Sequence, residues 1–172
     1  MTSPLLGVRD LPTMKPVQHS TAARVQELLG SQYTVLEFDQ PTRSAAEAAE
    51  AIGCTIAQIA KSLVFAGPDN EPVLIVASGI NQVDEKKVGA LLGGAIGQAD
   101  AAFVKKNTGF SIGGVPPLGH TKHPTILLDR DLERFTQIWA AAGTPNAVFK
   151  LTPVQLQSLT GGDYCEIKST DI

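Results

Sequence analysis

The spacing of apolar and polar residues along the chain predicts a succession of short helices and strands. Apolar residues that return with a period near 3.6 predict helices, and short apolar runs between Gly, Pro, Asp or Asn predict strands. The predicted helices cover residues 17–29, 42 or 44 to 52, 85–92 and 101–107, with a last helix that begins at 153. The predicted strands cover residues 34–38, 61–65, 72–77, 125–128, 137–142, 147–151 and 164–167.

Tight turns join several of these strands, and such turns favour antiparallel pairing. The turn at Asp69-Asn70 and the segment 143–146 each connect two strands into a hairpin. Because strands occur both in hairpins and between helices, we expect an α/β (α+β) fold with helices packed on a mixed, mostly antiparallel sheet. No repeat or linker divides the chain, so we expect one domain over residues 17–172 after a Pro-rich arm over residues 1–16.

Length and composition are typical of an ordered single-domain protein. The 172 residues are 43% hydrophobic and 18% charged, which supports a buried core. No apolar run approaches the roughly 20 residues that cross a membrane, and residues 1–16 lack the layout of a signal peptide. We therefore expect a soluble cytoplasmic protein without a membrane partner, in which Cys54 and Cys165 are reduced thiols.

The charge balance excludes some kinds of nucleic-acid binding. A net charge of -3 lacks the basic excess of proteins that depend on bulk attraction to nucleic acid, so no specific DNA partner is expected. Aromatic residues make up 5% of the chain, too few for a platform that stacks single-stranded bases. Small basic clusters such as Lys105-Lys106 still allow recognition of one nucleotide end.

Lys61 stands at the start of an apolar strand, which makes it a candidate site residue. Side chains alternate between the two faces of a strand, so Lys61 shares its face with Leu63 and Phe65 while Ser62 and Val64 point the other way. If the Phe65 face is buried, the ammonium needs an anion, a substrate or a route to solvent. The alternative is a lysine at a strand end that simply reaches water.

The segment 111–120 is so rich in Gly and Pro that its backbone shape is strongly restricted. Gly113 and Gly114 permit unusual conformations, and the two following prolines fix φ and remove two donors. The remaining amides can then be held toward a carbonyl, an oxyanion or a water molecule. The alternative is a tight surface turn that only connects two strands.

His120 ends this loop and is the acid–base candidate by residue type, although a loop histidine is commonly a polar surface residue. Other signals of chemistry are missing from the sequence, which has no GxSxG elbow, no Walker loop and no cluster of metal ligands. No metal and no cofactor are therefore expected.

Several of these pieces, in this order, resemble the YbaK/EbsC family, free-standing relatives of the editing domain of prolyl-tRNA synthetase. The resemblance extends over residues 17–168 and rests on the ordered set rather than on one motif. The matching pieces are AIGC at 51–54, QIAKSLVF at 58–65, DEKK at 84–87, the GGxxPxG loop at 113–119 and the hairpin AAGTPNA at 141–147.

The resemblance implies a mixed, barrel-like sheet and hydrolysis of the ester that joins a wrong small amino acid to the 3′ end of a tRNA. Cys, Ala, Ser and Thr are all open as the amino acid, and tRNA(Pro) is the favoured tRNA. The expected partners are the aminoacyl-tRNA 3′ end and an aminoacyl-tRNA synthetase. The alternative is a non-catalytic module that binds tRNA, a nucleotide or a protein.

Site residues follow from the same resemblance, which places the lysine of the KSL strand in the substrate pocket and uses the loop to place the ester or the water. His120 matches a position at which some relatives carry a functional histidine. The residues assigned to catalysis are Lys61, Gly113, Gly114, Pro117 and His120. Those assigned to substrate binding are Ser62, Val115, Pro116, Gly119, Gly143 and Asn146.

Overall fold

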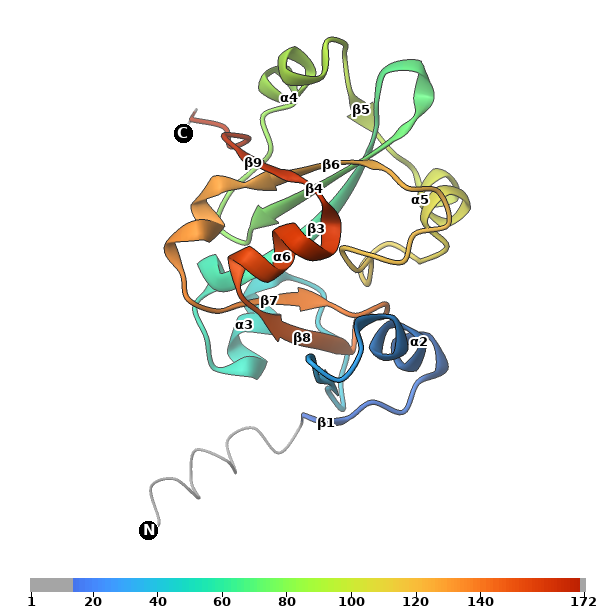
Figure 1. The fold of residues 1–172 in the computed structure, drawn as a ribbon, viewed down its shortest axis with the longest axis vertical. Helices are drawn as coiled ribbons and strands as arrows, with labels where there is room; N and C mark the ends of the chain where they lie inside the picture. The colour runs from blue at the N-terminus through green and yellow to red at the C-terminus, as the bar shows by residue number, and fades with distance from the viewer. Residues whose placement is uncertain (1–13, 171–172) are drawn as a thin grey trace.

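In the computed structural model, which describes residues 14–170, helices surround a mixed sheet (Figure 1). The strands are β1 Lys15–Pro16, β2 Val35–Glu37, β3 Ile59–Ala66, β4 Pro72–Ser78, β5 Gly97–Gln98, β6 Thr125–Asp129, β7 Ile138–Ala141, β8 Ala147–Leu151 and β9 Asp163–Cys165. The helices are α2 Ser20–Leu29, α3 Ala45–Ile52, α4 Glu85–Leu92, α5 Ala101–Thr108 and α6 Pro153–Thr160. Three short 3₁₀ turns are η1 Ile56–Gln58, η2 Pro68–Asn70 and η3 Arg130–Arg134.

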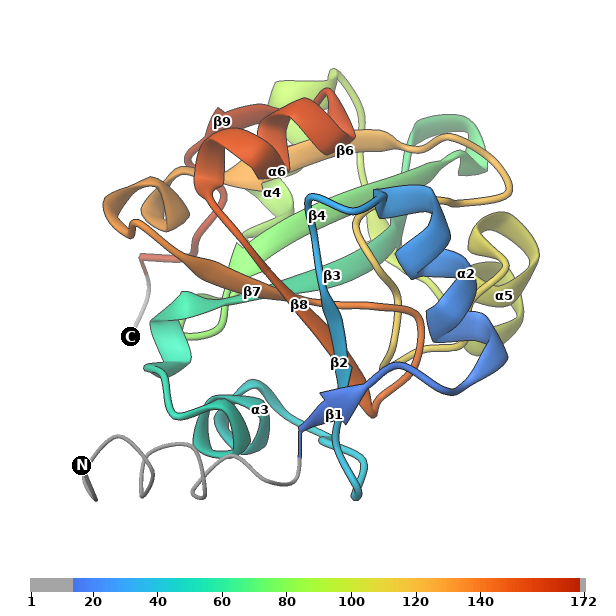
Figure 2. The ribbon, with the colours of Figure 1, turned by 60° about the horizontal axis from the view of Figure 1, so that its bottom comes forward.

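The sheet confirms the predicted mixed, mostly antiparallel fold class. Its strand order is β1-β2-β8-β7-β3-β4-β6-β9, and β5 pairs with β3 beside this path. The pairings β3–β7, β4–β6 and β6–β9 are parallel, and the other pairings are antiparallel. The sheet is strongly twisted, so that β2 and β8 cross the direction of β3 and β4 in Figure 2.

Side-chain caps and glycines set the ends of the helices. Ser44, rather than the alternative Thr42, caps α3, because its hydroxyl accepts a hydrogen bond from the Glu47 amide at 3.1 Å. Asp84 and Asp100 cap α4 and α5 as predicted. The glycines that follow α3, α4 and α5 are left-handed, a conformation that only glycine adopts without strain.

The apolar core lies on both faces of the sheet, and β4 is buried along its whole length. One face packs against α2, α5 and α6, with Val76, Leu128 and Phe149 among its buried side chains. The other face packs Ile75 and Ala77 against α4. A third cluster holds α3 against β3 and β8, so that α3 is fixed beside the strand that carries Lys61.

Several element ends differ by one or two residues from the sequence prediction, and three changes lie near the ends of the described chain. The first helix begins at Ser20 because the His19 side chain accepts a hydrogen bond from the Thr21 amide and caps it. The last strand is β9, Asp163–Cys165, rather than residues 164–167. Within the predicted arm of residues 1–16, Lys15–Pro16 pair with β2, whereas residues 1–13 lie outside the described residues. No helix of residues 14–170 is long and apolar enough to span a membrane.

Candidate functional site

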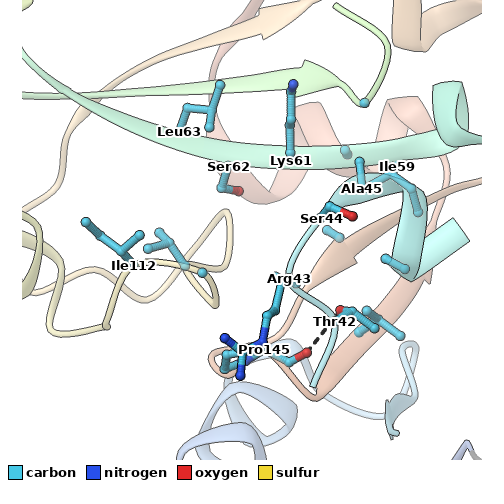
Figure 3. A pocket seen from close by; sticks show the side chains of 18 of the residues that line it. Thr42, Arg43, Ser44, Ala45, Ile59, Lys61, Ser62, Leu63, Ile112 and Pro145 are labelled. Carbon is cyan, nitrogen blue, oxygen red and sulfur yellow. Dashed lines mark hydrogen bonds between the residues drawn. The ribbon is translucent and has the colours of Figure 1, made fainter. Parts of the chain in front are cut away.

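A cavity of about 830 Å³ lies beside β3 and is the candidate site (Figure 3). Its walls come from β3, β7, the start of α3 and the segment before it, and the β7–β8 turn. Part of the segment 111–120, which we call the Gly/Pro loop, also lines it. Among the described residues that line it, Arg43 and Lys61 carry positive charge and none carries negative charge. Such a cavity suits an anionic ligand.

The cavity exists because one edge of β3 is only partly paired. β4 pairs with β3 along its length, from Ala60 to Ala66. On the opposite edge, β7 pairs with β3 only at Ile59 and Ala60, and β5 pairs with it only at Phe65 and Ala66. The middle of β3 therefore faces the cavity instead of a neighbouring strand.

Lys61 lies in this middle segment, and its side chain points away from that of Ser62 (Figure 3). Burial lowers the pKa of the Lys61 ammonium, and attraction to the Asp129 carboxylate partly opposes this shift. Lys61 forms no ion pair within residues 14–170. The half-buried ammonium is thus available to a ligand, and its role in the site stays a prediction.

Asp129 supplies a fixed negative charge behind Lys61. It is 1% exposed, and its Oδ2 accepts hydrogen bonds from the Ser78 amide at 3.0 Å and from Asn81 Nδ2 at 2.7 Å. Asp129 was not predicted as a site residue, since an acidic residue at a strand end has no distinctive spacing. Its role here is electrostatic, because no hydrogen bond or salt bridge joins it to Lys61 within residues 14–170.

Ser62 presents its side chain to the other face of β3, toward Ile112 in Figure 3. Its hydroxyl oxygen is buried and has no hydrogen-bond partner within residues 14–170. A buried hydroxyl without a partner costs about 1–3 kcal/mol of folding free energy, so such a group is usually reserved for a ligand or for water. The binding role of Ser62 stays a prediction.

Arg43 is a cavity residue that the sequence analysis missed. The preceding Thr42 is tied to the β7–β8 turn, because its amide and its Oγ1 both donate to the Pro145 carbonyl, at 2.9 and 3.0 Å. The Arg43 amide donates to Glu47 Oε1 at 2.7 Å, which fixes the backbone. Its guanidinium lies beside Pro145 and has no partner in the described chain (Figure 3). One arginine before a helix carries no recognisable sequence signal.

The first half of the Gly/Pro loop lines the cavity, except for Gly114, which packs against the β7–β8 turn. Gly113 and Val115 line the cavity together with Ile112. A Cβ atom at Gly114 would lie 2.5 Å from the Thr144 Cα, so only glycine lets the loop pack directly on the β7–β8 turn. Gly114 therefore positions its two neighbours rather than lining the cavity.

The second half of the loop lies apart from this cavity. Pro117, Gly119 and His120 line a separate hollow of about 80 Å³. His120 Nε2 is 2.7 Å from the Pro116 carbonyl, whereas Nδ1 is buried without a partner in the described chain. Burial lowers the pKa of His120, and the Pro116 contact partly opposes this. Neutral His120 can donate a hydrogen bond from Nε2 to the Pro116 carbonyl and so stabilise the conformation of the end of the loop.

The two predicted hairpin residues also lie outside the cavity lining. Gly143 has a φ of +105° and packs against α2 and Phe110. Asn146 donates from Nδ2 to the Phe38 carbonyl at 3.3 Å, which joins the turn to the chain after β2. Their neighbours Thr144 and Pro145 line the cavity instead. The residues of this turn that line the cavity are therefore not the two that were predicted.

Comparison with known proteins places the chain in a family. The profile of the aminoacyl-tRNA editing domain matches residues 39–159, which include β3, α3 and the Gly/Pro loop. The uncharacterized protein YwhH of Bacillus subtilis is 36% identical over 126 residues, which cover 73% of this chain and 80% of YwhH. EbsC of Enterococcus faecalis, provisionally described as a Cys-tRNA(Pro)/Cys-tRNA(Cys) deacylase, is 28% identical over 160 residues, which cover 91% of this chain and 98% of EbsC.

A solved structure supports the same assignment. The crystal structure of a provisionally described trans-editing enzyme for prolyl-tRNA synthetase has a TM-score of 0.84 and 42% sequence identity. The match covers 89% of this chain and 99% of that chain. Together, the sequence and structural matches confirm the family resemblance that the motifs predict.

Proposed function

The chain belongs to the aminoacyl-tRNA editing domain family, and from this premise we propose that it hydrolyses the ester between a mischarged small amino acid and tRNA. The observation that carries the proposal is the cavity at the free edge of the middle of β3, where Lys61 and Arg43 are available and where none of the described lining residues is acidic. The 3′ end of an aminoacyl-tRNA carries both phosphates and an ester. In this cavity the Lys61 and Arg43 side chains can bind phosphates, and the polar groups of β3 and the Gly/Pro loop can bind the ester.

Local charge rather than total charge supports tRNA binding. The chain as a whole has a net charge of -3, so the substrate is not held by a broad basic surface. Lys61 and Arg43 come from different elements and line one cavity, where each can neutralise a phosphate oxygen of the terminal nucleotides. Lys61 projects to the face of β3 opposite to Ser62, whereas Arg43 lies on the Ser62 side (Figure 3), so we place different phosphates at these two residues and the aminoacyl group against β3 and the Gly/Pro loop.

The reaction needs a water molecule placed on the ester carbonyl, because an aminoacyl ester is already activated. The water oxygen bonds to the carbonyl carbon, the bond to the ribose oxygen breaks, and that oxygen takes up a proton. The amides of the Gly113 segment and β3 are suited to place the ester and to stabilise charge on its carbonyl oxygen. We assign activation of the water to the neighbouring ribose hydroxyl.

The amino acid and the tRNA are proposals that rest on relatives. The name of EbsC refers to Cys-tRNA(Pro), and the solved relative refers to prolyl-tRNA synthetase. We therefore propose tRNA(Pro) charged with Cys, Ala or another small amino acid as the substrate, with a synthetase as an associated protein in the cytoplasm. A restricted cavity can exclude a larger amino acid by size.

A deacylation panel tests the proposal. The protein is incubated with tRNA(Pro) charged with Ala, Cys or Pro and with tRNAs charged with Ser or Thr, and the remaining aminoacyl-tRNA is measured. We expect rapid loss of at least one mischarged species and protection of Pro-tRNA(Pro). Loss of activity in Lys61→Ala, with full activity in the exposed-lysine control Lys86→Ala, would assign the reaction to this cavity.

The same panel can contradict the proposal. Binding of tRNA without turnover of any species would instead favour the alternative, a non-catalytic module. Full activity of Lys61→Ala on every accepted substrate would show that the reaction takes place without the lysine, and the mechanism above would then be wrong.

A further inference from the structure

We propose that the main chain of Ser62 binds the aminoacyl group of the substrate as if it were one residue of an additional strand. The inference rests on the proposed function and assigns a specific part of the site to the amino acid itself. Three polar groups of this one residue face the cavity side of β3: the amide N–H, the carbonyl and the side-chain hydroxyl.

The direction of the Ser62 main-chain groups follows from the hydrogen bonds at the two ends of the β3–β4 hairpin. The Gly79 amide donates to the Ile59 carbonyl at 2.8 Å, and the Gly67 amide donates to the Glu71 carbonyl at 2.7 Å. In an antiparallel pair every second residue bonds to the partner strand. Odd-numbered residues of β3 therefore bond to β4, and even-numbered residues direct their N–H and C=O to the opposite edge.

On that opposite edge, Ser62 lies between the positions at which the two short strands β7 and β5 pair with β3. Ala60 pairs with Ala140 of β7, and Ala66 pairs with Gly97 of β5. No residue of either strand is in register with Ser62, and the cavity lies between them, lined by Ala140 on one side and Gln98 on the other. Main-chain groups away from bulk water are rarely left unpaired, so the N–H and C=O of the partly buried Ser62 are suited to a ligand or water in the cavity.

An aminoacyl ester has the complementary pair of groups. Its α-ammonium is a donor and its ester carbonyl is an acceptor, and both are attached to the same α-carbon, as in one residue of a strand. The Ser62 carbonyl can accept from the ammonium while the Ser62 N–H donates to the ester oxygen. The latter bond strengthens as negative charge develops on that oxygen during attack by water.

The geometry also assigns the two faces of β3 to different parts of the substrate. Residues directly opposite each other in an antiparallel pair project their side chains to the same face. The side chain of the bound amino acid would therefore lie beside the Ser62 hydroxyl, on the side of Ile112 in Figure 3. Lys61 projects to the other face and is left for the phosphate.

Replacing one backbone amide by an ester tests the role of the Ser62 N–H. In the first variant, Ser62→Ala, only the hydroxyl is lost. In the second, lactic acid is incorporated at position 62, which removes the N–H as well and leaves an alanine-like side chain. We expect the second variant to have a kcat about 100-fold below that of Ser62→Ala, as for loss of one oxyanion donor.

The matched control is phenyllactic acid at position 65. It removes the N–H of residue 65, which is expected to donate to β4 because odd-numbered residues of β3 bond to that strand. The hairpin is weakened, and the N–H and C=O of Ser62 are unchanged. We expect a lower Tm and a nearly unchanged kcat. Equal loss of kcat in the control and in the lactic acid variant would overturn the inference and reduce Ser62 to a structural role.

A substrate comparison tests the Ser62 carbonyl and needs no variant. Propionyl-tRNA lacks the α-ammonium of alanyl-tRNA but has a side chain of the same size. When each enzymatic rate is divided by the rate of spontaneous hydrolysis of the same ester, we expect the ratio for alanyl-tRNA to be at least about tenfold higher, because a hydrogen bond to a charged donor is lost in the propionyl ester. Equal ratios in a protein that hydrolyses both would overturn this half of the inference while leaving the deacylase proposal intact.

A binding measurement separates failure of the inference from failure of the proposed function. Alanine joined by an amide to 3′-amino-3′-deoxyadenosine has the same donor and acceptor but cannot be hydrolysed by ester cleavage. We expect the ¹H–¹⁵N resonance of Ser62 to shift downfield when this compound binds. A shift in a protein without turnover would leave a binding site without the proposed reaction, whereas binding with no change at Ser62 would overturn the inference.

Discussion

The middle of β3 and the Gly/Pro loop are the two regions that the sequence marks for function, and they are built in opposite ways. In β3, polar groups at Lys61 and Ser62 have no partner in the described chain and face a cavity. In the loop, Gly114 packs on the backbone of Thr144, and His120 lies 2.7 Å from the Pro116 carbonyl. The middle of β3 presents polar groups to the cavity, whereas Gly114 and the second half of the loop mainly contact other parts of the chain.

This difference separates two meanings of an unusual sequence. A dense run of Gly and Pro indicates that a backbone shape is specified, but that shape can serve packing as much as binding. A lysine in an apolar strand places an ammonium where burial costs folding free energy. An anionic ligand that binds the ammonium can offset this cost. Substitutions at Lys61 and Ser62 should therefore affect activity more than stability, and substitutions at Gly114 and in the second half of the loop should do the reverse.

Lys61→Met gives the largest expected effect and tests the β3 side of the comparison. We expect deacylation to fall by at least about 100-fold, as when a positioned electrostatic group is removed. Because burial disfavours the Lys61 charge, the apolar replacement should leave Tm equal or higher. Thermal unfolding measured beside the deacylation rate checks both parts. A clear fall in Tm would show that Lys61 stabilises the fold and would weaken the contrast.

Gly114→Ala is the corresponding substitution on the loop side. The new methyl group would lie 2.5 Å from the Thr144 Cα, and backbone atoms cannot move away as a side chain can. We expect the free energy of unfolding to fall by about 2–3 kcal/mol, with loss of activity as a consequence. Gly97→Ala, where no atom lies within 4 Å of the added carbon, is the control. Denaturant unfolding of both variants gives the comparison, and equal stabilities would contradict it.

Arg43→Ala is expected to have a smaller effect, confined to binding. Loss of one charge-assisted contact should raise KM about tenfold with little change in kcat, because the phosphate is bound equally before and during reaction. The slope of log affinity against log salt should fall by about one. Arg24→Ala, an exposed arginine of α2 that does not line the cavity, is the control. A change in kcat alone would place Arg43 nearer to the chemistry than we infer.

Much of the fold could be predicted from the sequence because its signals are local. Asp84, Asp100 and the glycines after the helices act on their own helix ends, and the Asp69-Asn70 turn fixes the β3–β4 hairpin. The sequence could not decide whether Thr42 or Ser44 caps α3. The Thr42 hydroxyl donates a hydrogen bond to the Pro145 carbonyl, which is 103 positions away along the chain, and so it does not cap the helix. Contacts between distant segments leave no periodic signal.

The site could be predicted only where one residue type was itself unusual. Lys61 and Gly113 were found in this way, and both line the cavity. Arg43 was missed, because its position depends on the Thr42–Pro145 contact. The gap beside Ser62 was also beyond the sequence, since it arises from the lengths of β5 and β7 rather than from any residue of β3.

His120 gives the smallest expected effect and the sharpest test of the loop as a structural element. His120→Ala should lower the free energy of unfolding by about 1 kcal/mol through loss of one hydrogen bond, with little change in kcat. The pKa of His120 is lower in the folded protein than in the unfolded chain. The unfolded chain therefore binds more protons over this interval, and stability falls as pH decreases from about 7 through 6.5 and below.

This pH dependence should be reduced in His120→Ala and kept in His123→Ala, whose imidazole is exposed and lies close enough to oppose protonation of His120. Tm measured between pH 7.5 and pH 5 for the three proteins checks the sign. If His120→Ala instead abolished the pH dependence of kcat while Tm was unaffected, His120 would act on the substrate, and the loop would belong with β3 as part of the reacting site. A change in Tm alone would keep the two regions distinct.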